Sequence, residues 1–359
     1  MAKFPLFRLD DLIFDDIYPL LDELDLLTVV ECCPLAATII KAPRKQLPNY
    51  HIEIAVEKTK AWLTLFRDDE KVLKWTICLK RHHVIANTIQ FEERQVAGKT
   101  WRVAMTPKTL PTNWLSVNHY DTFESDILRI AEHFKKVFRC SVKKIVLDMG
   151  ETHSFKKLLV DSPALRVAEC IEVSKVVFTK EEMDFMMGNF VTEKLIFEGT
   201  AGKDYKYQKP LNFPIVKLSF ARWIGDEELL EMVRHHKQIG LEDTKVTNEG
   251  LNQLIINWLG GSGLAGDDKA LEFVEVSRET GEERSVFDIE AIMKGIEYTP
   301  GVEKWDYLFK NFLSTNHRFQ DGMDIRREDG KVATIIVTQR GYADMFFMAV
   351  WSDPYPDKV

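Results

Sequence analysis

Two glycine-rich segments have the composition of phosphate-binding turns. Residues 261–266 read GSGLAG, the G-x-G-x-x-G spacing that allows a tight turn and close approach of the backbone to a pyrophosphate. A predicted helix precedes this segment and a predicted strand follows it, so no helix N-terminus points at a phosphate. Residues 199–204 are too short for a phosphate loop, and Asp204 stands where the magnesium-binding hydroxyl belongs. We interpret both segments as turns, with a nucleotide-binding enzyme built on residues 261–266 as the alternative.

Two pairs of adjacent histidines could ligate a metal or titrate near neutral pH. They are His82-His83 and His235-His236. Adjacent side chains point apart on either a strand or a helix, so neither pair can chelate one ion well. A solvated or partner-facing role is the better interpretation. His235 and His236, together with Trp223 at a strand-to-helix turn, are candidate contacts to a binding partner.

The cysteines indicate a reducing compartment and no thiol chemistry. Five are present, an odd number without any C-x-x-C pair: Cys32, Cys33, Cys78, Cys140 and Cys170. Such scattered free cysteines are typical of small buried apolar side chains in an intracellular protein. No serine, cysteine or threonine stands in a nucleophile motif such as G-x-S-x-G. We therefore predict no catalytic residue, no metal and no cofactor, and hence no enzyme.

Composition predicts a globular intracellular protein. The chain has 359 residues with 45% apolar content and a formal net charge of -8. An acidic balance argues against a binder of the phosphate backbone of nucleic acid. No apolar run reaches the length of a membrane span, and residues 1–5 lack the apolar stretch of a signal peptide. We expect a cytoplasmic or nuclear location, with neither nucleic acid nor membrane as partner.

The first 31 residues form a separate acidic module. They hold eight carboxylates against Lys3 and Arg8, a local balance of -6. Their apolar residues follow steps of three and four, which place them on one stripe of a helix: Leu9, Leu12, Ile13, Ile17, Leu20, Leu21 and Leu24. A second short helix follows from Asp25, a third begins at Pro34, and residues 42–48 form a linker.

This predicted three-helix module is too small to bury all of its own apolar surface. A piece of about forty residues lies below the size at which a core usually stabilises itself. Part of the surface is therefore expected to face a partner. The alternative is that the module packs on the rest of this chain.

The remaining chain, residues 46–359, is predicted to combine strands and helices. Residues 50–106 alternate in the manner of antiparallel strands, residues 121–139 form an amphipathic helix, and residues 319–352 form a C-terminal hairpin or meander. Short apolar strands recur with spacings of 24, 24, 23 and 23, centred on Leu147, Ile171, Leu195, Leu218 and Leu241. A sixth strand lies at 271–276, and helices are predicted at 180–190, 226–235 and 248–259.

One strand plus one helix every 23 or 24 residues has the length of a leucine-rich-repeat unit. The predicted fold class is therefore α/β. A small N-terminal three-helix module is followed, at residues 121–300, by an irregular leucine-rich-repeat-like strand-helix array. Antiparallel β segments are expected at both ends of the large domain.

The N-terminal residues resemble an F-box, the helical motif by which substrate receptors dock on the Skp adaptor of cullin-RING ubiquitin ligases. Residues 4–9, FPLFRL, have the form seen in the large nematode F-box family. Asp10 and Glu23 stand where that family usually has proline, so we expect docking with lower affinity. The resemblance implies an F-box over residues 1–45 and these adaptor contacts: Phe4, Pro5, Leu6, Leu9, Leu12, Ile13, Ile17, Leu20, Leu21 and Leu24.

The large domain resembles the type-2 F-box-associated domain of nematodes. The residues that carry the likeness are Trp223-Ile224, 246–252, Trp258, Gly260-Gly261, 292–296, 322–334, Phe347 and Trp351. The resemblance implies that residues 46–359 recognise a substrate protein, and it supplies no catalytic residue. The predicted function is a substrate-recognition adaptor of a Skp-cullin-F-box ubiquitin ligase, with an unidentified protein as target. The alternative is a repeat-type protein-binding module that engages no ligase.

Overall fold

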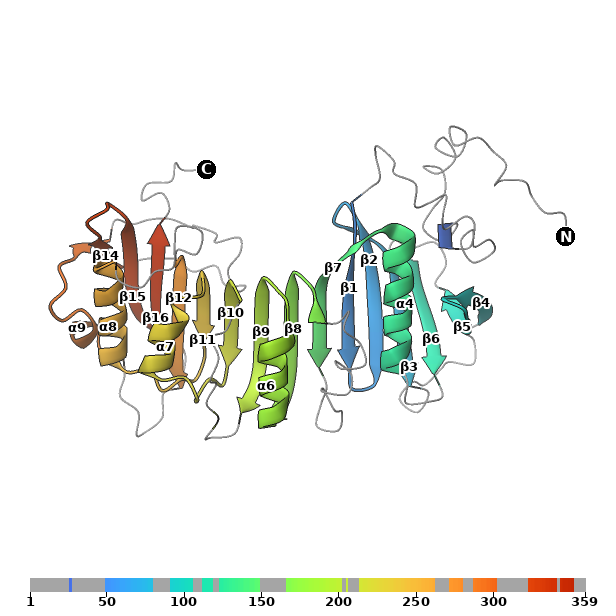
Figure 1. Ribbon diagram of the computed structural model, residues 1–359, viewed down its shortest axis with the longest axis horizontal. Helices are drawn as coiled ribbons and strands as arrows, with labels where there is room; N and C mark the ends of the chain where they lie inside the picture. The colour runs from blue at the N-terminus through green and yellow to red at the C-terminus, as the bar shows by residue number, and fades with distance from the viewer. Residues whose placement is uncertain are drawn as a thin grey trace, which may run out of the picture. The chain divides into compact units, whose positions relative to one another are not determined.

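The computed structural model describes residues 26–27, 49–79, 91–105, 112–118, 123–148, 166–201, 205, 213–261, 271–279, 287–301, 322–340 and 343–351. The chain divides into two compact units, unit 1 over residues 1–171 and unit 2 over residues 172–359. This boundary falls inside a strand, and sequence analysis did not predict it. Figure 1 labels the elements of both units.

Unit 1 is built on a mixed sheet with one long helix. Its elements are β1 Tyr50–Glu57, β2 Lys60–Arg67, β3 Glu70–Leu79, β4 Glu92–Val96, β5 Lys99–Met105, β6 Thr112–Asn118, α4 Phe123–Phe138 and β7 Ser141–Asp148. The strand order is β7-β1-β2-β3-β6-β5-β4. The β1–β7 and β3–β6 pairs are parallel, and the other pairs are antiparallel. The connection from β6 to β7 therefore passes over three strands.

Apolar alternation determines which face of the unit 1 sheet meets α4. Ile52, Ile54 and Val56 are buried on β1, and alternate positions of a strand share one face. Helix α4 presents its buried apolar stripe to β1, β2 and β3, and Figure 1 shows it lying along that face. Trp75 of β3 and Phe134 of α4 join the layers, with ring centroids 6.4 Å apart. The core of unit 1 lies between this helix and these three strands.

Unit 2 combines parallel strands with an antiparallel end. Its elements are β8 Cys170–Phe178, α6 Lys180–Asn189, β9 Lys194–Ala201, β10 Ile215–Ser219, α7 Asp226–Met232, β11 Gln238–Leu241, α8 Asn248–Leu259, β12 Phe273–Glu279, α9 Ile289–Ile292, β13 Thr299–Pro300, β14 Met323–Arg326, β15 Val332–Arg340 and β16 Ala343–Trp351. The strand order is β8-β9-β10-β11-β12-β16-β15-β14-β13. Strands β9 to β12 are parallel, and the pairs from β12 through β16 to β13 are antiparallel.

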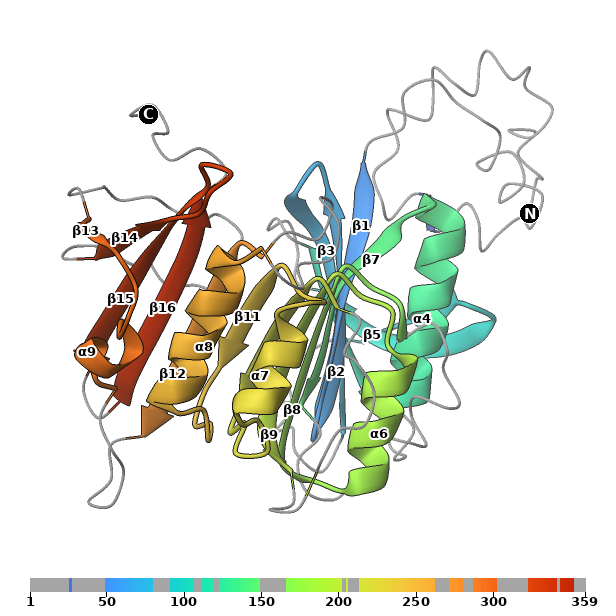
Figure 2. The same cartoon turned by 60° about the vertical axis from the view of Figure 1, so that its left-hand side comes forward.

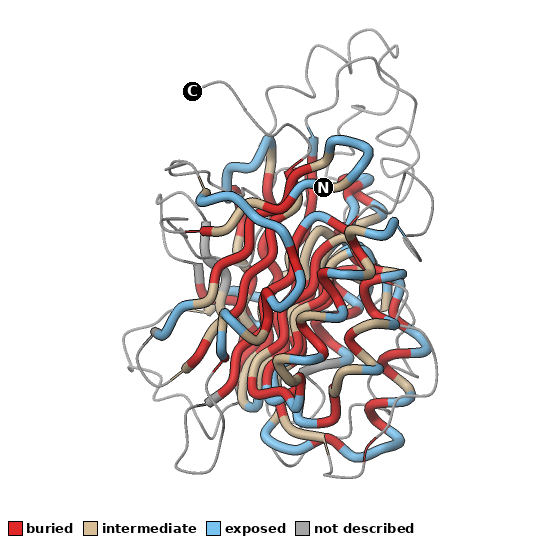
Figure 3. The backbone as a smooth tube through the Cα atoms, turned by 90° about the vertical axis from the view of Figure 1, so that its left-hand side faces the viewer, coloured by how far each residue is buried: buried red, intermediate tan, exposed pale blue. Residues whose placement is uncertain are grey.

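Helices α6, α7 and α8 lie on one face of the unit 2 sheet (Figure 2). The predicted capping box at the start of α6 is confirmed, since Thr179 Oγ1 accepts from Glu182 N at 3.2 Å and Glu182 Oε2 accepts from Thr179 N at 3.0 Å. Thr247 is the N-cap of α8 and accepts from Gly250 N at 3.1 Å, without a reciprocal side-chain bond. Buried residues follow the strands and the inner sides of these helices in Figure 3. The predicted helix at 248–259 matches α8.

The predicted fold class is wrong. Among the described residues the chain forms sixteen strands and five helices, and these strands build mixed sheets instead of a helical module followed by a repeat array. The even strand spacing misled the prediction because helix crossovers between parallel strands have similar lengths without being copies of one unit. The intervening helices have 10, 7 and 12 residues. Each of the five predicted leucine and isoleucine positions nevertheless lies in a strand, β7 to β11, although not at its centre.

The predicted N-terminal helices lie outside the described residues, with one exception. Leu26 and Leu27 are helical, and each is only 1% exposed. Within the described ranges, no helix has the length and apolar character needed to cross a membrane.

Candidate functional site

The adaptor contacts implied by the F-box resemblance fall outside the described residues. This applies to Phe4, Pro5, Leu6, Leu9, Leu12, Ile13, Ile17, Leu20, Leu21 and Leu24. The pair His82-His83 and residues 262–266 of the glycine-rich segment also lie outside them. Their roles remain predictions from sequence.

The three candidate partner contacts of unit 2 do not form one surface. Trp223 is buried at 7% exposure, and its ring packs edge-on against Tyr205 with centroids 5.3 Å apart. His236 is fully buried, and its Nδ1 contacts the carbonyl oxygen of Phe213. His235 is partly exposed beside Glu231, 3.1 Å from its Oε1. Only His235 can reach a partner directly.

Two of the described cysteines, Cys78 and Cys140, are poor nucleophiles. Burial raises the pKa of the Cys140 thiol to about 12 and also raises the pKa of Cys78. Both therefore stay protonated at neutral pH, and a thiol is a much weaker nucleophile than a thiolate. Within the described part of the chain, no three His, Cys, Asp or Glu side chains converge as metal ligands would.

Gly199 has a structural explanation that involves no phosphate. It lies in β9, and a Cβ atom there would come 2.1 Å from the carbonyl oxygen of Lys175 and 2.5 Å from the Phe178 ring. The position thus needs a glycine because a neighbouring strand and ring approach the backbone closely. Residues 199–201 form the end of β9 and make no phosphate loop.

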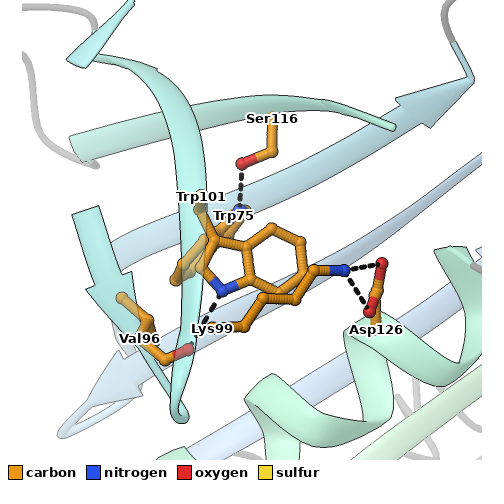
Figure 4. Close-up of polar contacts among 6 residues, drawn as sticks. All are labelled: Trp75, Val96, Lys99, Trp101, Ser116 and Asp126. Atoms are coloured by element: carbon orange, nitrogen blue, oxygen red, sulfur yellow. Dashed lines mark hydrogen bonds and ion pairs between the residues drawn. The ribbon is translucent and has the colours of Figure 1, made fainter. Parts of the chain in front are cut away.

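A polar cluster in unit 1 joins the β4–β5 hairpin to helix α4 (Figure 4). Lys99 Nζ lies 2.8 Å from both carboxylate oxygens of Asp126, and it also lies 4.5 Å from the Trp101 ring centroid. Trp101 Nε1 donates to the carbonyl of Val96 at 3.0 Å. Trp75 Nε1 donates to Ser116 Oγ at 2.9 Å. Each of these groups has a partner within the cluster. We interpret the cluster as a structural contact that holds the β4–β5 hairpin in position.

The exposed apolar side chains of unit 2 include three near the ends of β8 and β10, the two strands on either side of β9. Val176 and Val177 are 62% and 57% exposed near the end of β8, and Phe220 is 45% exposed directly after β10. Thr200 Oγ1, near the end of β9, donates to the carbonyl of Val176 at 2.7 Å, which places the ends of β8 and β9 together. We call Val176, Val177 and Phe220 the strand-end strip.

Phe220 is unusual in its backbone as well as in its exposure. Its φ is 55°, in the left-handed region that is costly for a bulky side chain. Asp243 follows β11 at the corresponding place and has a φ of 54°. Aspartate tolerates this conformation because its short polar side chain bonds locally, whereas phenylalanine gains nothing there. Neither backbone preference nor burial therefore explains a phenylalanine at position 220.

The charged groups beside the strand-end strip are paired. Glu242 accepts from Ser219 Oγ at 2.6 Å and lies 2.7 Å from Lys217 Nζ. Burial lowers the pKa of Lys217, but the hydrogen bond to Glu242 and the charges of nearby glutamates outweigh it, so the pKa lies above its ordinary value. Arg222 pairs with Asp243. With these charges neutralised in place, the distinguishing property of this edge is its exposed apolar surface.

Sequence reasoning missed the strand-end strip, although one signal was available. Val176 and Val177 are adjacent and both apolar, which breaks the alternation expected of a strand with one buried face. Lys175 reaches Glu182 of α6 at 2.8 Å, and Phe178 packs on Phe197 with centroids 4.5 Å apart. Lys175 thus reaches helix α6 and Phe178 packs on β9, while the two valines between them remain exposed.

Comparison with known proteins gives little information on family. No family model matches the chain. The chain is similar to an uncharacterized protein of Caenorhabditis elegans, with 20% identity over 350 residues, which cover 93% of this chain and 74% of that protein.

Proposed function

We propose that this chain is a substrate-recognition adaptor of a Skp-cullin-F-box ubiquitin ligase. Its N-terminal segment, residues 4–42, binds a Skp-family adaptor, and unit 2 binds a target protein through the strand-end strip. The proposal is supported by the FPLFRL sequence at residues 4–9. The adaptor contributes proximity between target and ligase and no bond chemistry of its own.

Phe220 is the observation that carries the target-binding part of the proposal. A large apolar side chain that is 45% exposed and has a φ of 55° costs folding free energy. Exposed aromatic side chains of this kind are typical anchors of protein interfaces. These three side chains are already about half covered, so burying the rest of each against a partner would contribute roughly half of the 1.5–3 kcal/mol that complete burial of an exposed side chain contributes. Phe220 therefore lowers the stability of the free chain, and its burial against a partner would offset that loss.

The test separates the two binding functions in the full chain. Phe220→Asn removes the aromatic ring, and asparagine suits a left-handed φ, so relief of the backbone cost offsets the loss of the partly covered ring and the chain is expected to stay folded. We expect target proteins recovered with the parent chain to be lost from Phe220→Asn while a purified Skp protein still binds. Ile256→Asn is the matched control, since Ile256 is 43% exposed on α8.

Each half of the proposal can fail separately. Leu12→Asp combined with Leu20→Asp should abolish binding of the Skp protein, measured by calorimetry, without changing recovery of the target. If the parent chain shows no affinity for a Skp protein, the ligase assignment is wrong. If Phe220→Asn and Ile256→Asn recover the same proteins as the parent chain, the strand-end strip is not the target site.

A protein-binding module without a ligase is the second candidate. Leu26 and Leu27 favour it, because both are almost completely buried beside the predicted adaptor contacts. A segment that packs on its own chain has less apolar surface left for a partner. The Skp measurement above distinguishes the two candidates.

A further inference from the structure

The N-terminal end of β1 is hydrogen-bonded to the turn between β2 and β3. Asn49, directly before β1, donates its amide to Asp68 Oδ1 at 3.1 Å, and its carbonyl oxygen accepts from the Asp68 amide at 3.0 Å. Asp68 and Asp69 form the tip of this turn, with φ values of 49° and 65°. Two successive left-handed residues other than glycine cost free energy, so the turn depends on the contacts that hold it.

Lys143 of β7 reaches this turn across β1, which lies between β7 and β2 (Figure 1). In the pairing of β1 with β7, the register shifts between Ile52 and Glu53, which makes Lys143 the extra residue of a β-bulge. Lys143 Nζ lies 2.9 Å from Asp69 Oδ1. The bulge thus directs a lysine of β7 to the tip of a turn two strands away.

His51 of β1 lies buried beside this ion pair. Its side chain is 8% exposed, and its ring stacks on Phe66 of β2 with centroids 4.6 Å apart and an interplanar angle of 10°. His51 Nδ1 lies 4.0 Å from Asp69 Oδ1, beyond hydrogen-bond distance. We call His51, Phe66, Asp69 and Lys143 the His51 cluster.

The charges around His51 act in opposite directions. Burial, and after it the ammonium of Lys143, lowers the pKa of His51 below its ordinary value of 6.5. Three carboxylates raise this pKa without outweighing those effects: Asp69, Glu53 and Glu169. Lys71 of β3 places a further ammonium 5.8 Å from the centroid of the Phe66 ring. The folded cluster therefore holds a neutral imidazole at pH 7 and resists its protonation.

We propose that protonation of His51 separates the β2–β3 turn from the start of β1, so that this end of unit 1 opens in mildly acidic solution. A charged imidazole is better solvated by water than by the Phe66 ring, and the Lys143 ammonium repels it. When the ring leaves, the turn loses the packing beside it, and its two left-handed residues relax. Asn49 is also where residues 1–48 join the sheet. Opening therefore loosens the point at which the N-terminal segment is attached to unit 1.

Opening should increase only as the pH falls. Above pH 6.5, His51 is neutral in the closed and in the opened state, and the full stability of the cluster is present. Below this pH, the opened state binds a proton that the closed state binds less well, until the pH reaches the lowered pKa of His51. One proton changes the opening equilibrium by about tenfold per pH unit at most. The pKa of Asp69 is itself lowered from 3.8, so Asp69 stays ionised throughout this range.

Hydrogen exchange at single amides tests the proposal in the full chain. We expect the Asp68 amide, which donates to Asn49, to lose up to about tenfold of its protection per pH unit between about pH 6.5 and about pH 5, after correction for intrinsic exchange. An NMR titration of the His51 ring should give a pKa below 6.5. A pKa at or above 6.5, or equal protection of Asp68 at about pH 7.5 and about pH 5.5, would overturn the proposal.

Two substitutions of His51 separate its titration from other effects of acid. His51→Phe keeps an aromatic ring on Phe66, and His51→Gln keeps a polar side chain. Neither variant takes up a proton at this position, so protection of the Asp68 amide should no longer depend on pH in this range. His235→Gln, in unit 2, is the matched control and should leave the pH dependence at Asp68 as it is in the parent chain. Loss of protection in acid that persists in the His51 variants would mean that other groups cause the opening.

A substitution of Lys143 tests the repulsion. Lys143→Met removes the ammonium beside the ring and is expected to raise the pKa of His51 toward its ordinary value, which weakens the pH dependence at Asp68. Lys58→Met, in the exposed turn at the other end of β1, is the control and should change neither. An unchanged pKa of His51 in Lys143→Met would contradict the repulsion on which the opening depends.

Discussion

The two units use similar layers of sheet and helix but leave their apolar surface in different places. Unit 1 joins long strands mainly by tight hairpins and covers one face with a single helix, and the half-buried Trp62 of β2 lies on the opposite face among charged side chains. Unit 2 connects several parallel strands through helices on one side, and three apolar side chains protrude where strands end. Apolar side chains along a strand end fit a loop or an extended segment of a partner.

The comparison assumes that each unit has a core of its own, and the largest predicted effect tests this. Trp75 in unit 1 and Trp258 in unit 2 are almost completely buried. We expect Trp75→Ala to cost about 3–5 kcal/mol, since it leaves a cavity and removes the partner of the buried Ser116 hydroxyl. Hydrogen exchange should show the loss of protection in β1, β2, β3 and β6.

Trp258→Ala is the matched variant, and its loss of protection should be concentrated in β10, β11 and β12. Equal loss of protection throughout the chain for both variants would contradict the comparison. It would show instead that the units unfold as one cooperative core.

The two units place glycines in different surroundings. Substituting these glycines is predicted to change the free energy of unfolding less than the tryptophan substitutions do. Gly199→Ala places a methyl group against the Lys175 carbonyl and the Phe178 ring and should cost about 1–3 kcal/mol. Gly98, in the β4–β5 turn, has open space around it and a φ of 72°. Gly98→Ala should therefore cost only about 1–2 kcal/mol through its backbone. Urea unfolding measures both changes in the free energy of unfolding.

Gly188 supplies the control for these substitutions. It lies in helix α6 with nothing within 4 Å of an added Cβ. Gly188→Ala should stabilise the chain by about 0.5–1 kcal/mol, because alanine loses less conformational entropy in a helix. Loss of stability here would mean that any methyl group disturbs this region, and the close approach at Gly199 would then explain nothing.

Local patterns in the sequence predicted elements better than they predicted architecture. Helix α8 and the capping box at Thr179 follow from short-range signals, namely apolar spacing and a side chain three residues away. The fold class depended on how strands pair, which is set by contacts between distant residues that a single sequence does not display. The parallel pairing of β3 with β6, for example, joins segments whose separation gives no hint of register.

The candidate surfaces were hard to predict for a related reason. Exposure of Phe220 depends on a turn after β10 in which Phe220 itself has a left-handed φ. Such positions are usually predicted from a glycine or an asparagine, and this turn has neither at that position. The alternating pattern around Trp62 was visible, but which of its two faces would meet α4 was not. Trp223 was a candidate because a turn was expected there, yet its ring packs on Tyr205. Side-chain direction at a turn is set by what surrounds it.

The smallest predicted effect concerns an exposed turn carboxylate in each unit. Asp329 in unit 2 pairs with Arg327, whose hydrogen bonds lower the pKa of Asp329 from 3.8 to about 2. Asp69 in unit 1 has its pKa lowered by a hydrogen bond from Lys143. A carboxyl group with a depressed pKa stabilises the folded state above its unfolded pKa, and this contribution is lost as the pH falls toward the folded pKa.

Stability should therefore decline between about pH 4 and pH 2 less steeply in Asp329→Asn than in the parent chain. Asp69→Asn should show a similar but weaker change, because a guanidinium donates two fixed hydrogen bonds to a carboxylate where an ammonium offers a single point charge. Thermal unfolding at a series of pH values measures both variants. A larger change for Asp69→Asn would indicate that Lys143 holds its turn more firmly than Arg327 does. The hairpin turn of unit 1 would then be the better fixed of the two, the reverse of the order that the ion-pair geometry predicts.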